Sequence, residues 1–191
     1  MFKKEPRVKA LSNLKNSDRK KLQTRIQSQF NDPNFKFESN VIKQTNFVST
    51  VTQGTIYTND EGNIPIFFKE KHKDTIYPTV YTCWSRPRLI PIILTHGIVL
   101  QDHIFNGANL MISGTVPPFD SRLQKDTICG IADKTSPNVI LAIGVVELND
   151  LTKYNETGVL GQSGVAVKVV HHFEDGLFKE FKVRLDIPEP I

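Results

Sequence analysis

A direct passage from a helix to a strand near residue 107 is the feature that most constrains the fold. From Thr95 onward the apolar residues recur at helical spacing, in a short amphipathic stretch that comprises Ile98, Val99, Asp102 and Phe105. The stretch ends at Asn106-Gly107, where glycine is able to take the left-handed conformation that closes a helix. A predicted strand from Ala108 to Ile112 follows without a linker, so helix and strand must meet in one tight turn.

Further short strands dominate the second half of the chain. We predict them at Thr127 to Ala132, Val139 to Val146 and Val165 to His172, separated by turns that contain proline and glycine. Several short strands with one early helix favour a closed barrel, because closure removes the exposed edges of a sheet. There are no internal repeats.

The first half begins with a predicted helix. Ser17 can cap a helix that starts near Asp18, and Leu22, Ile26 and either Gln29 or Phe30 recur at helical spacing. The opposite face carries Arg19, Lys20 and Arg25. The helix should stop in the segment 31–34, because proline cannot continue it and the Asx residues favour turns.

A β-meander should follow the helix and pack on it. The predicted strands are Val41 to Val51, Thr55 to Thr58 and Ile64 to Lys69, and the turn-forming cluster 59–63 joins the last two. Prolines then interrupt regular structure, and we place the domain boundary within residues 86–91. The predicted division is an amino-terminal α/β domain over 1–92, a barrel domain over 93–181, and the start of a linker over 182–191, which contains Pro188 and Pro190.

The charge distribution indicates a polyanionic partner. The chain holds 24 Lys and Arg against 20 Asp and Glu, a net charge of +4. Nine of the basic residues but only two of the acidic ones lie within residues 1–25, which gives this segment +7 and leaves −3 for the remainder. Such asymmetry points to a polyanion more strongly than the overall charge does.

The two cysteines suggest neither a disulfide nor a zinc site. Cys83 and Cys129 lack a CxxC partner, and we expect two buried thiols. No apolar run approaches the length of a membrane span, and charges occupy the amino terminus where a secretory signal would be apolar. We therefore expect a cytoplasmic protein that does not associate with a membrane.

No motif of an enzyme is present. The sequence lacks a P-loop, a GxGxxG and a GxSxG, and we expect no catalytic residues, no cofactor and no metal. His171 and His172 are adjacent on a predicted strand and should point to opposite faces, one packed and one exposed. His96 and His103 lie about two helical turns apart without a ligand cluster.

Trp84, the only tryptophan, should pack between the domains, and the alternative is a docking surface for another domain or protein.

Several motifs resemble the ligatin family of eukaryotic translation factors. The helix-to-strand turn Phe105 to Met111 resembles that of a PUA domain, a small RNA-binding β-barrel. The other matching stretches are Tyr77 to Ser85, Met1 to Lys4 with Arg7 to Lys9, Ser17 to Leu22, Ala142 to Gly144, and His171 to Leu177. A shorter related family, the malignant T-cell-amplified PUA proteins, shares the two-domain layout. The resemblance implies an α+β fold in which a small helix-plus-β-meander domain, the pre-PUA domain, precedes a PUA-type pseudo-β-barrel.

The resemblance also implies a function on the small ribosomal subunit. The family contacts this subunit and its rRNA, delivers initiator tRNA without GTP, and acts in reinitiation and in post-termination recycling of deacylated tRNA. The tRNA would be handled by carboxy-terminal domains absent from this sequence, and we expect a monomer. The expected RNA-binding residues are Lys3, Lys4, Arg7, Lys9, Lys20 and Lys21, with Gly107, Ala108 and Asn109 of the PUA turn, while Met111 should face the core. Residues 112–114 are Ile-Ser-Gly where a proline commonly precedes the glycine in PUA turns.

Two other functions are compatible with the sequence. One is a PUA adaptor that binds tRNA or another structured RNA. The other is a protein-interaction scaffold, as in the shorter family, which pairs with density-regulated protein. Binding that does not depend on salt would favour the scaffold.

Overall fold

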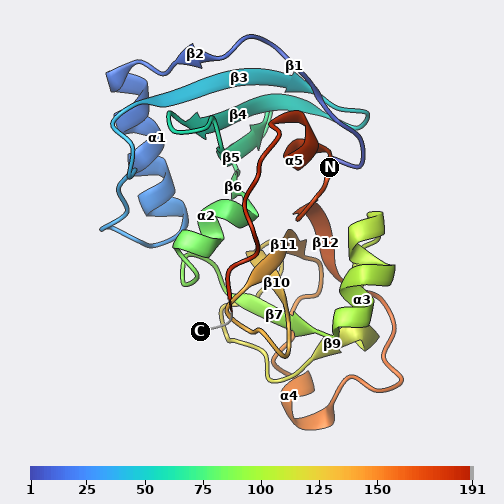
Figure 1. Cartoon of the computed structure of the whole chain (residues 1–191). Coiled ribbons are helices and arrows are strands. Elements are labelled where there is room, and N and C mark those ends of the chain that lie inside the picture. Colours follow the sequence, from blue (N-terminus) through green and yellow to red (C-terminus); the bar gives the residue numbers. More distant parts are fainter. Residues whose placement is uncertain (190–191) are drawn as a thin grey trace.

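The first half of the chain folds into a sheet flanked by a long helix. The computed structural model describes residues 1–189, and Figure 1 shows the helix α1 beside one end of the sheet. The strand order is β1-β3-β4-β5-β6, and β2 also pairs with β3. The elements of this half are β1 (Arg7–Val8), β2 (Ser12–Asn13), α1 (Asn16–Gln29), β3 (Ile42–Val48), β4 (Gln53–Asn59), β5 (Pro65–Glu70), β6 (Ile76–Pro78) and α2 (Val80–Ser85).

The helix α1 begins one residue before its predicted cap. Lys15 is the N-cap residue and has an extended backbone, with no side-chain capping bond, so the predicted cap at Ser17 is wrong because Ser17 already lies in the first turn. Leu22 and Ile26 are buried as predicted. The chain leaves the helix after Gln29, and Asn31 adopts a left-handed φ of 51°.

The second half forms a nearly closed sheet. Its strand order is β8-β12-β11-β10-β7-β9, and only a short 3-10 helix separates the two end strands β8 and β9 along the chain. The elements are β7 (Ile92–Thr95), α3 (Gly97–Asp102), η1 (Ile104–Asn106), β8 (Leu110–Met111), η2 (Ile112–Gly114), β9 (Thr115–Val116), β10 (Ile128–Asp133), β11 (Ile140–Val146), α4 (Tyr154–Thr157), β12 (Val165–His172) and α5 (Gly176–Glu180). The predicted α+β fold with a pseudo-β-barrel is confirmed.

The predicted helix before the turn is correct in place but not in its buried face. Leu100 of α3 and Ile104 of η1 are buried, whereas Ile98 is 62 % exposed. Met111 is also 45 % exposed, contrary to the expectation that it faces the core, because its neighbour Leu110 takes the inward position of the strand. Strand β7 was not predicted, and it pairs parallel to β10.

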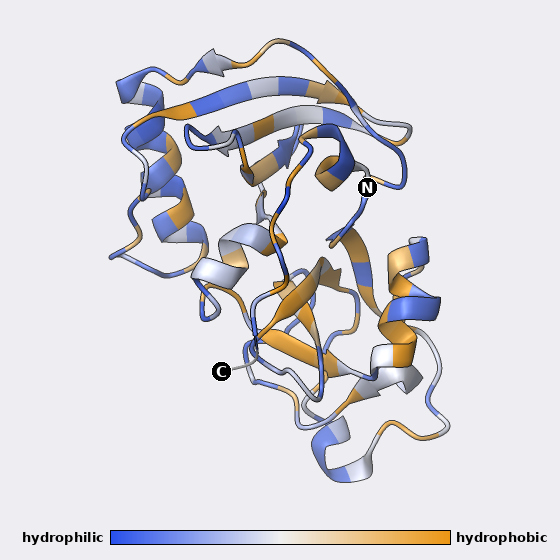
Figure 2. Cartoon of the chain, in the orientation of Figure 1, coloured by the Kyte–Doolittle hydropathy of each residue, from blue (hydrophilic) through white to orange (hydrophobic). Residues whose placement is uncertain are grey.

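The two halves share one hydrophobic cluster. Phe2, Phe47 and Phe68 of the first half pack in the same cluster as Ile140 and Leu177 of the second. Figure 2 shows β7, β10 and β11 as mainly hydrophobic, whereas β3 is hydrophobic at its two ends and hydrophilic between them. The two halves share a common core, so packing does not mark a boundary between them. The division after residue 92 therefore remains a prediction.

Trp84 lies at this junction. Its Nε1–H donates to the Ile140 carbonyl at 2.7 Å, and its ring packs edge-on against Tyr81 at 5.4 Å between centroids. The expected role of Trp84 in packing between the two halves is confirmed, although part of the ring is exposed.

Both histidines of the pair on β12 are buried. His171 is 0 % and His172 is 7 % exposed, so the expectation of one exposed histidine is wrong. The reason is that the first half covers the face of β12 that would otherwise meet solvent: the His171 ring packs against Phe2, Phe68 and Tyr81. Cys83 and Cys129 are free and buried, as expected, and burial raises the pKa of both thiols.

The carboxy-terminal segment runs back along the molecule (Figure 1). Residues 183–189 form no helix or strand, yet Val183 is buried in the shared cluster. The predicted start of a linker at residue 182 remains a prediction, and its last two residues, 190 and 191, lie outside the described residues.

Candidate nucleic-acid interface

The turn after η1 presents a fixed backbone to solvent. Gly107 has a φ of 82°, and its N–H donates to the Ile104 carbonyl at 2.8 Å. Asn109 is exposed, and its Oδ1 accepts a hydrogen bond from the backbone N–H of Val169 in β12 at 3.1 Å. Ala108 is exposed between them. The turn is therefore tied to the barrel at both ends and is held in one conformation.

The amino-terminal segment brings a cation to this turn. A Cβ atom added to Gly107 would lie 2.8 Å from Cε of Lys3, so the lysine chain covers the glycine. The segment is anchored by Phe2, which is 1 % exposed and whose carbonyl accepts the N–H of Gly176 at 2.7 Å. The packing of Phe2 thus fixes the position of Lys3, whereas a disordered leader would leave Lys3 without a fixed position.

A second cation, Lys168, lies on β12, the strand that binds Asn109, and was not predicted. It is exposed on β12, next to the residue that binds Asn109. Burial lowers the pKa of the Met1 amino group most, Asp175 raises it, and the charges of Lys3 and Lys168 lower it further. A single charge within the apolar run 165–170 was the signal available in the sequence. We call Lys3, Gly107, Ala108, Asn109 and Lys168 the turn surface.

The other predicted RNA-binding residues lie away from the turn. Lys4 is exposed beyond Lys3, whereas Arg7 and Lys9 lie along the edge of the first sheet, where β1 pairs with β3. Lys20 and Lys21 lie on α1, and Lys21 is 3.7 Å from Asp18 in an exposed pair. The basic residues that are contiguous in sequence therefore occupy at least two separate surfaces.

Two arginines of the amino-terminal segment have structural partners instead. Arg19 donates to the carbonyls of Ser39 and Asn40 at 3.2 and 3.0 Å. Arg25 pairs with the Asp74 carboxylate at 2.6 Å, and this guanidinium lowers the pKa of Asp74 through a hydrogen bond. These contacts hold α1 to loops of its own half.

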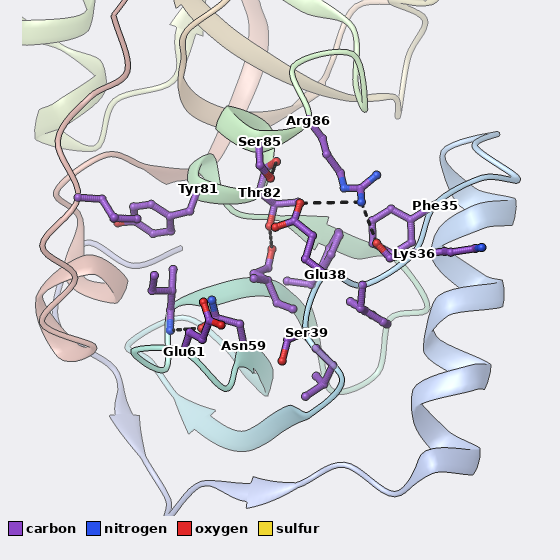
Figure 3. A pocket seen from close by; sticks show the side chains of 16 residues that line it. Phe35, Lys36, Glu38, Ser39, Asn59, Glu61, Tyr81, Thr82, Ser85 and Arg86 are labelled. Atoms are coloured by element: carbon purple, nitrogen blue, oxygen red, sulfur yellow. Dashed lines mark hydrogen bonds and ion pairs between the residues drawn. The ribbon is translucent and has the colours of Figure 1, made fainter.

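A cavity of about 310 Å³ is lined by the segment 35–39, by residues of the first sheet and by α2 (Figure 3). Its wall includes Phe35, over whose ring the Arg86 guanidinium lies at 4.7 Å. Ser85 and Thr82 donate their hydroxyls to backbone carbonyls at 3.1 and 2.6 Å, and neither is paired with a base. These two hydroxyls thus serve structural contacts.

Among residues 1–189, no group of three or more His, Cys, Asp or Glu is arranged to hold a metal ion. No helix in this described range has the length and apolar character needed to cross a membrane.

Two family models together cover most of the chain. Residues 2–87 match the Pre-PUA-like domain, and residues 90–176 match the eIF2D PUA domain. Two archaeal structures share the fold: a conserved PUA domain protein from Thermoplasma acidophilum (TM-score 0.66, 15 % identity, 90 % of this chain and 99 % of that chain) and a PUA domain from Aeropyrum pernix K1 in a tartrate complex (TM-score 0.69, 19 % identity, 93 % and 92 %).

Curated relatives from eukaryotes are similar over nearly the full length of this chain. Translation machinery-associated protein 64 of Saccharomyces cerevisiae is 58 % identical over 188 residues, covering 98 % of this chain and 33 % of the relative. Eukaryotic translation initiation factor 2D of Mus musculus is 32 % identical over 191 residues, covering 94 % and 31 %. The chain spans about a third of the length of these relatives. On these matches, the chain belongs to the ligatin family, which includes the eukaryotic translation initiation factor 2D proteins and yeast translation machinery-associated protein 64.

Proposed function

We propose that this chain is the RNA-binding module that docks a ligatin-family translation factor onto rRNA of the small ribosomal subunit. The observation that carries the proposal is the turn surface, where Lys3 covers Gly107 beside the exposed Ala108 and Asn109, and Lys168 is next to Val169, which binds Asn109. The names of the relatives refer to translation machinery and translation initiation, which supports a role in translation. Catalysis and a cofactor are not part of this proposal.

In this proposal, the lysines supply the affinity for RNA and hydrogen bonds fix its position. Lysines that neutralise phosphates release counterions, which supplies affinity without reading sequence. The exposed Asn109 amide adds hydrogen bonds that fix the orientation of the RNA, whereas the Gly107 and Ala108 N–H groups are already bonded within the turn. Because the turn is already ordered by its bonds to Ile104 and Val169, little conformational entropy is lost when RNA binds.

The proposal for the whole factor follows from the family. Such a factor would act in the cytosol and place initiator tRNA without GTP, or would help to release deacylated tRNA during recycling. The tRNA contacts would come from the parts of the relatives that lie outside this chain. Lys4, Arg7, Lys9, Lys20 and Lys21 remain proposed rRNA contacts.

Binding to purified small subunits in parallel with naked structured RNA tests the proposal. We expect the chain to bind subunits with saturation, and the variant Lys3→Ser/Lys168→Ser to bind more weakly. The matched control is Lys125→Ser/Lys134→Ser, which removes the same charge from exposed positions elsewhere on the barrel half. A preference for naked RNA over subunits would favour the PUA adaptor. Binding to neither would contradict RNA docking and favour the scaffold.

A further inference from the structure

Two rows of side chains cross the open end of the first sheet on one face. In the first row Arg7 pairs with Val48, and Val48 pairs with Gln53. The Lys71 N–H donates to the Gln53 carbonyl at 2.9 Å and so extends this row past β5. Residues directly opposite each other on antiparallel strands project to the same face, so the row begins and ends with a cation.

The second row repeats this arrangement. The Lys9 N–H donates to the Asn46 carbonyl at 3.0 Å, Asn46 pairs with Thr55, and Thr55 pairs with Lys69. Arg7 and Lys9 are two residues apart, as are Lys69 and Lys71, so each pair is separated by about 6.6 Å along its strand. We call these two rows the sheet face; they comprise four cations around a polar centre.

The intervening row points the other way. Phe47, which lies between the two rows, is 1 % exposed and packs in the shared core. Phe47 pairs with Gly54, and Gly54 pairs with Glu70, so Glu70 belongs to the same intervening row. Its carboxylate is bound by Lys73 at 2.8 Å and by the Thr52 hydroxyl at 3.0 Å. Strand alternation therefore keeps the acidic side chain of β5 out of the two cationic rows.

The helix α1 covers only the other end of this face. Leu22 of α1 shares a hollow with Gln44, Tyr57 and Lys69, so Lys69 is half-buried at the border of the covered end. The end toward the β3–β4 turn carries an open hollow of about 530 Å³. That open hollow is lined by Arg7, Lys9, Asn46, Gln53, Thr55 and Lys71. In the described part of the chain, Arg7, Lys9, Lys69 and Lys71 form no ion pair.

We infer that the sheet face is a second RNA contact, which binds the phosphodiester backbone and is separate from the turn surface. The inference rests on the proposed function and adds Lys69, Lys71, Asn46 and Thr55 to it. Four unpaired cations complement phosphate charge, and amide and hydroxyl groups between them donate to phosphate oxygens.

The composition of the sheet face favours RNA over a protein partner. Val48 is the only apolar side chain in the two rows, whereas protein interfaces are usually centred on buried aromatic or aliphatic anchors. The amino-terminal segment also connects the two proposed surfaces, since residues 3 to 7 span at most about 14 Å. One RNA backbone can therefore contact Lys3 at the turn surface and Arg7 at the sheet face.

Salt-dependent binding of Lys69→Ser/Lys71→Ser tests the inference, with small subunits and a fluorescent RNA hairpin as separate probes. If both lysines contact phosphates, the slope of log K against log salt should shrink by about 1.4 to 1.8, roughly a 25- to 60-fold loss of affinity in about 0.1 M salt. Lys71→Glu, at an exposed position beyond β5, gives a second variant that does not disturb the strand. The control Lys125→Ser/Lys134→Ser should change the slope much less.

Three outcomes separate the inference from the proposed function. Equal slopes for Lys69→Ser/Lys71→Ser and the control, on both probes, would overturn the sheet face as an RNA contact. If the intact chain binds the hairpin but not the subunits, ribosome docking fails, while a reduced slope of the variant on the hairpin still supports the sheet face. If poly-glutamate displaces the hairpin as well as unlabelled RNA does, the face binds acidic polypeptides, which would also overturn the inference.

Discussion

Lys3 covers Gly107, so that a Cβ atom at residue 107 would lie 2.8 Å from the lysine Cε. The two residues are far apart in sequence and belong to different halves of the molecule. Phe2 holds this contact in place from the shared core. A cation of the amino-terminal segment is thereby added to a turn of the barrel, and this arrangement is the basis of the proposed RNA contact.

Gly107→Ala should lower the free energy of unfolding by about 1 to 2 kcal/mol, because an L-residue is strained in the left-handed region. Gly107 has a φ of 82°. The overlap with Lys3 should contribute little, since the touched atoms lie on a flexible side chain. Urea denaturation measures the loss, and a loss below about 0.3 kcal/mol would show that the turn relaxes.

A Lys3→Ala background provides the control for Gly107→Ala. If backbone strain dominates, Gly107→Ala should cost nearly the same in this background as in the wild type. A cost that disappears when Lys3 is truncated would instead assign the effect to the side-chain overlap.

Asp175→Ala should be strongly destabilising, by at least about 3 kcal/mol, because several buried donors lose their acceptor. The Asp175 carboxylate accepts from His171 Nδ1 at 2.8 Å, from the His172 N–H at 3.2 Å, and from the first amides of α5, of which Leu177 N–H is at 2.9 Å. Asp175→Asn keeps an oxygen for α5 and should lose less, about 1 to 2 kcal/mol. Equal losses for the two variants in chemical denaturation would contradict this account.

The stability of the fold should decrease as the pH falls below about 6.5 because of His172. Burial, the largest effect, lowers its pKa from the ordinary value of 6.5, while the Phe173 carbonyl and Asp175 partly oppose the shift. Between the folded and unfolded pKa values the unfolded state binds more protons, so stability rises with pH through this window and the contribution is lost below the folded pKa. His172→Gln should show a shallower decrease between pH 7.5 and 5.5 in denaturation curves, and an unchanged slope would exclude His172 as its source.

Trp84→Phe should cost about 1 to 2 kcal/mol, because it leaves the Ile140 carbonyl without its indole donor. The indole N–H gives one NMR signal, since the chain has one tryptophan. This proton should exchange slowly with solvent if it bridges the two halves. Rapid exchange under native conditions would mean that the halves separate frequently at this point.

Local patterns in the sequence were sufficient to predict most strands and the closing turn. Short runs of strand-forming residues bounded by turn residues located β3, β11 and β12, and Asn106-Gly107 marked the left-handed closure confirmed at Gly107. Strand β7 was not recognised, because it has only four residues and directly follows Pro91, where regular structure was expected to be interrupted. The short β1 and β2 likewise lack periodicity and exist through pairing with β3.

Features that depend on contact between the halves could not be predicted from local patterns. His171 is buried because the rings of Phe2, Phe68 and Tyr81 cover a barrel strand, and nothing in the sequence near His171 indicates this. The basic amino-terminal segment reads as one charged stretch, yet anchoring of Phe2 sends Lys3 to the barrel turn and Arg7 to the sheet edge. Lys69 and Lys71 are two residues apart at the end of β5, a signal that becomes informative only once Lys71 is known to line an open hollow and Lys69 to border it.

Binding of this chain to purified small ribosomal subunits across a salt series tests the central proposal most directly. The comparison is a variant in which Lys3, Lys4, Arg7, Lys9, Lys20 and Lys21 are changed to serine. We predict saturable binding by the intact chain and a salt slope that shrinks in the variant by about 0.7 to 0.9 for each phosphate contact that is lost. Absence of binding by the intact chain, or a slope that the six substitutions leave unchanged, would contradict docking through these basic residues.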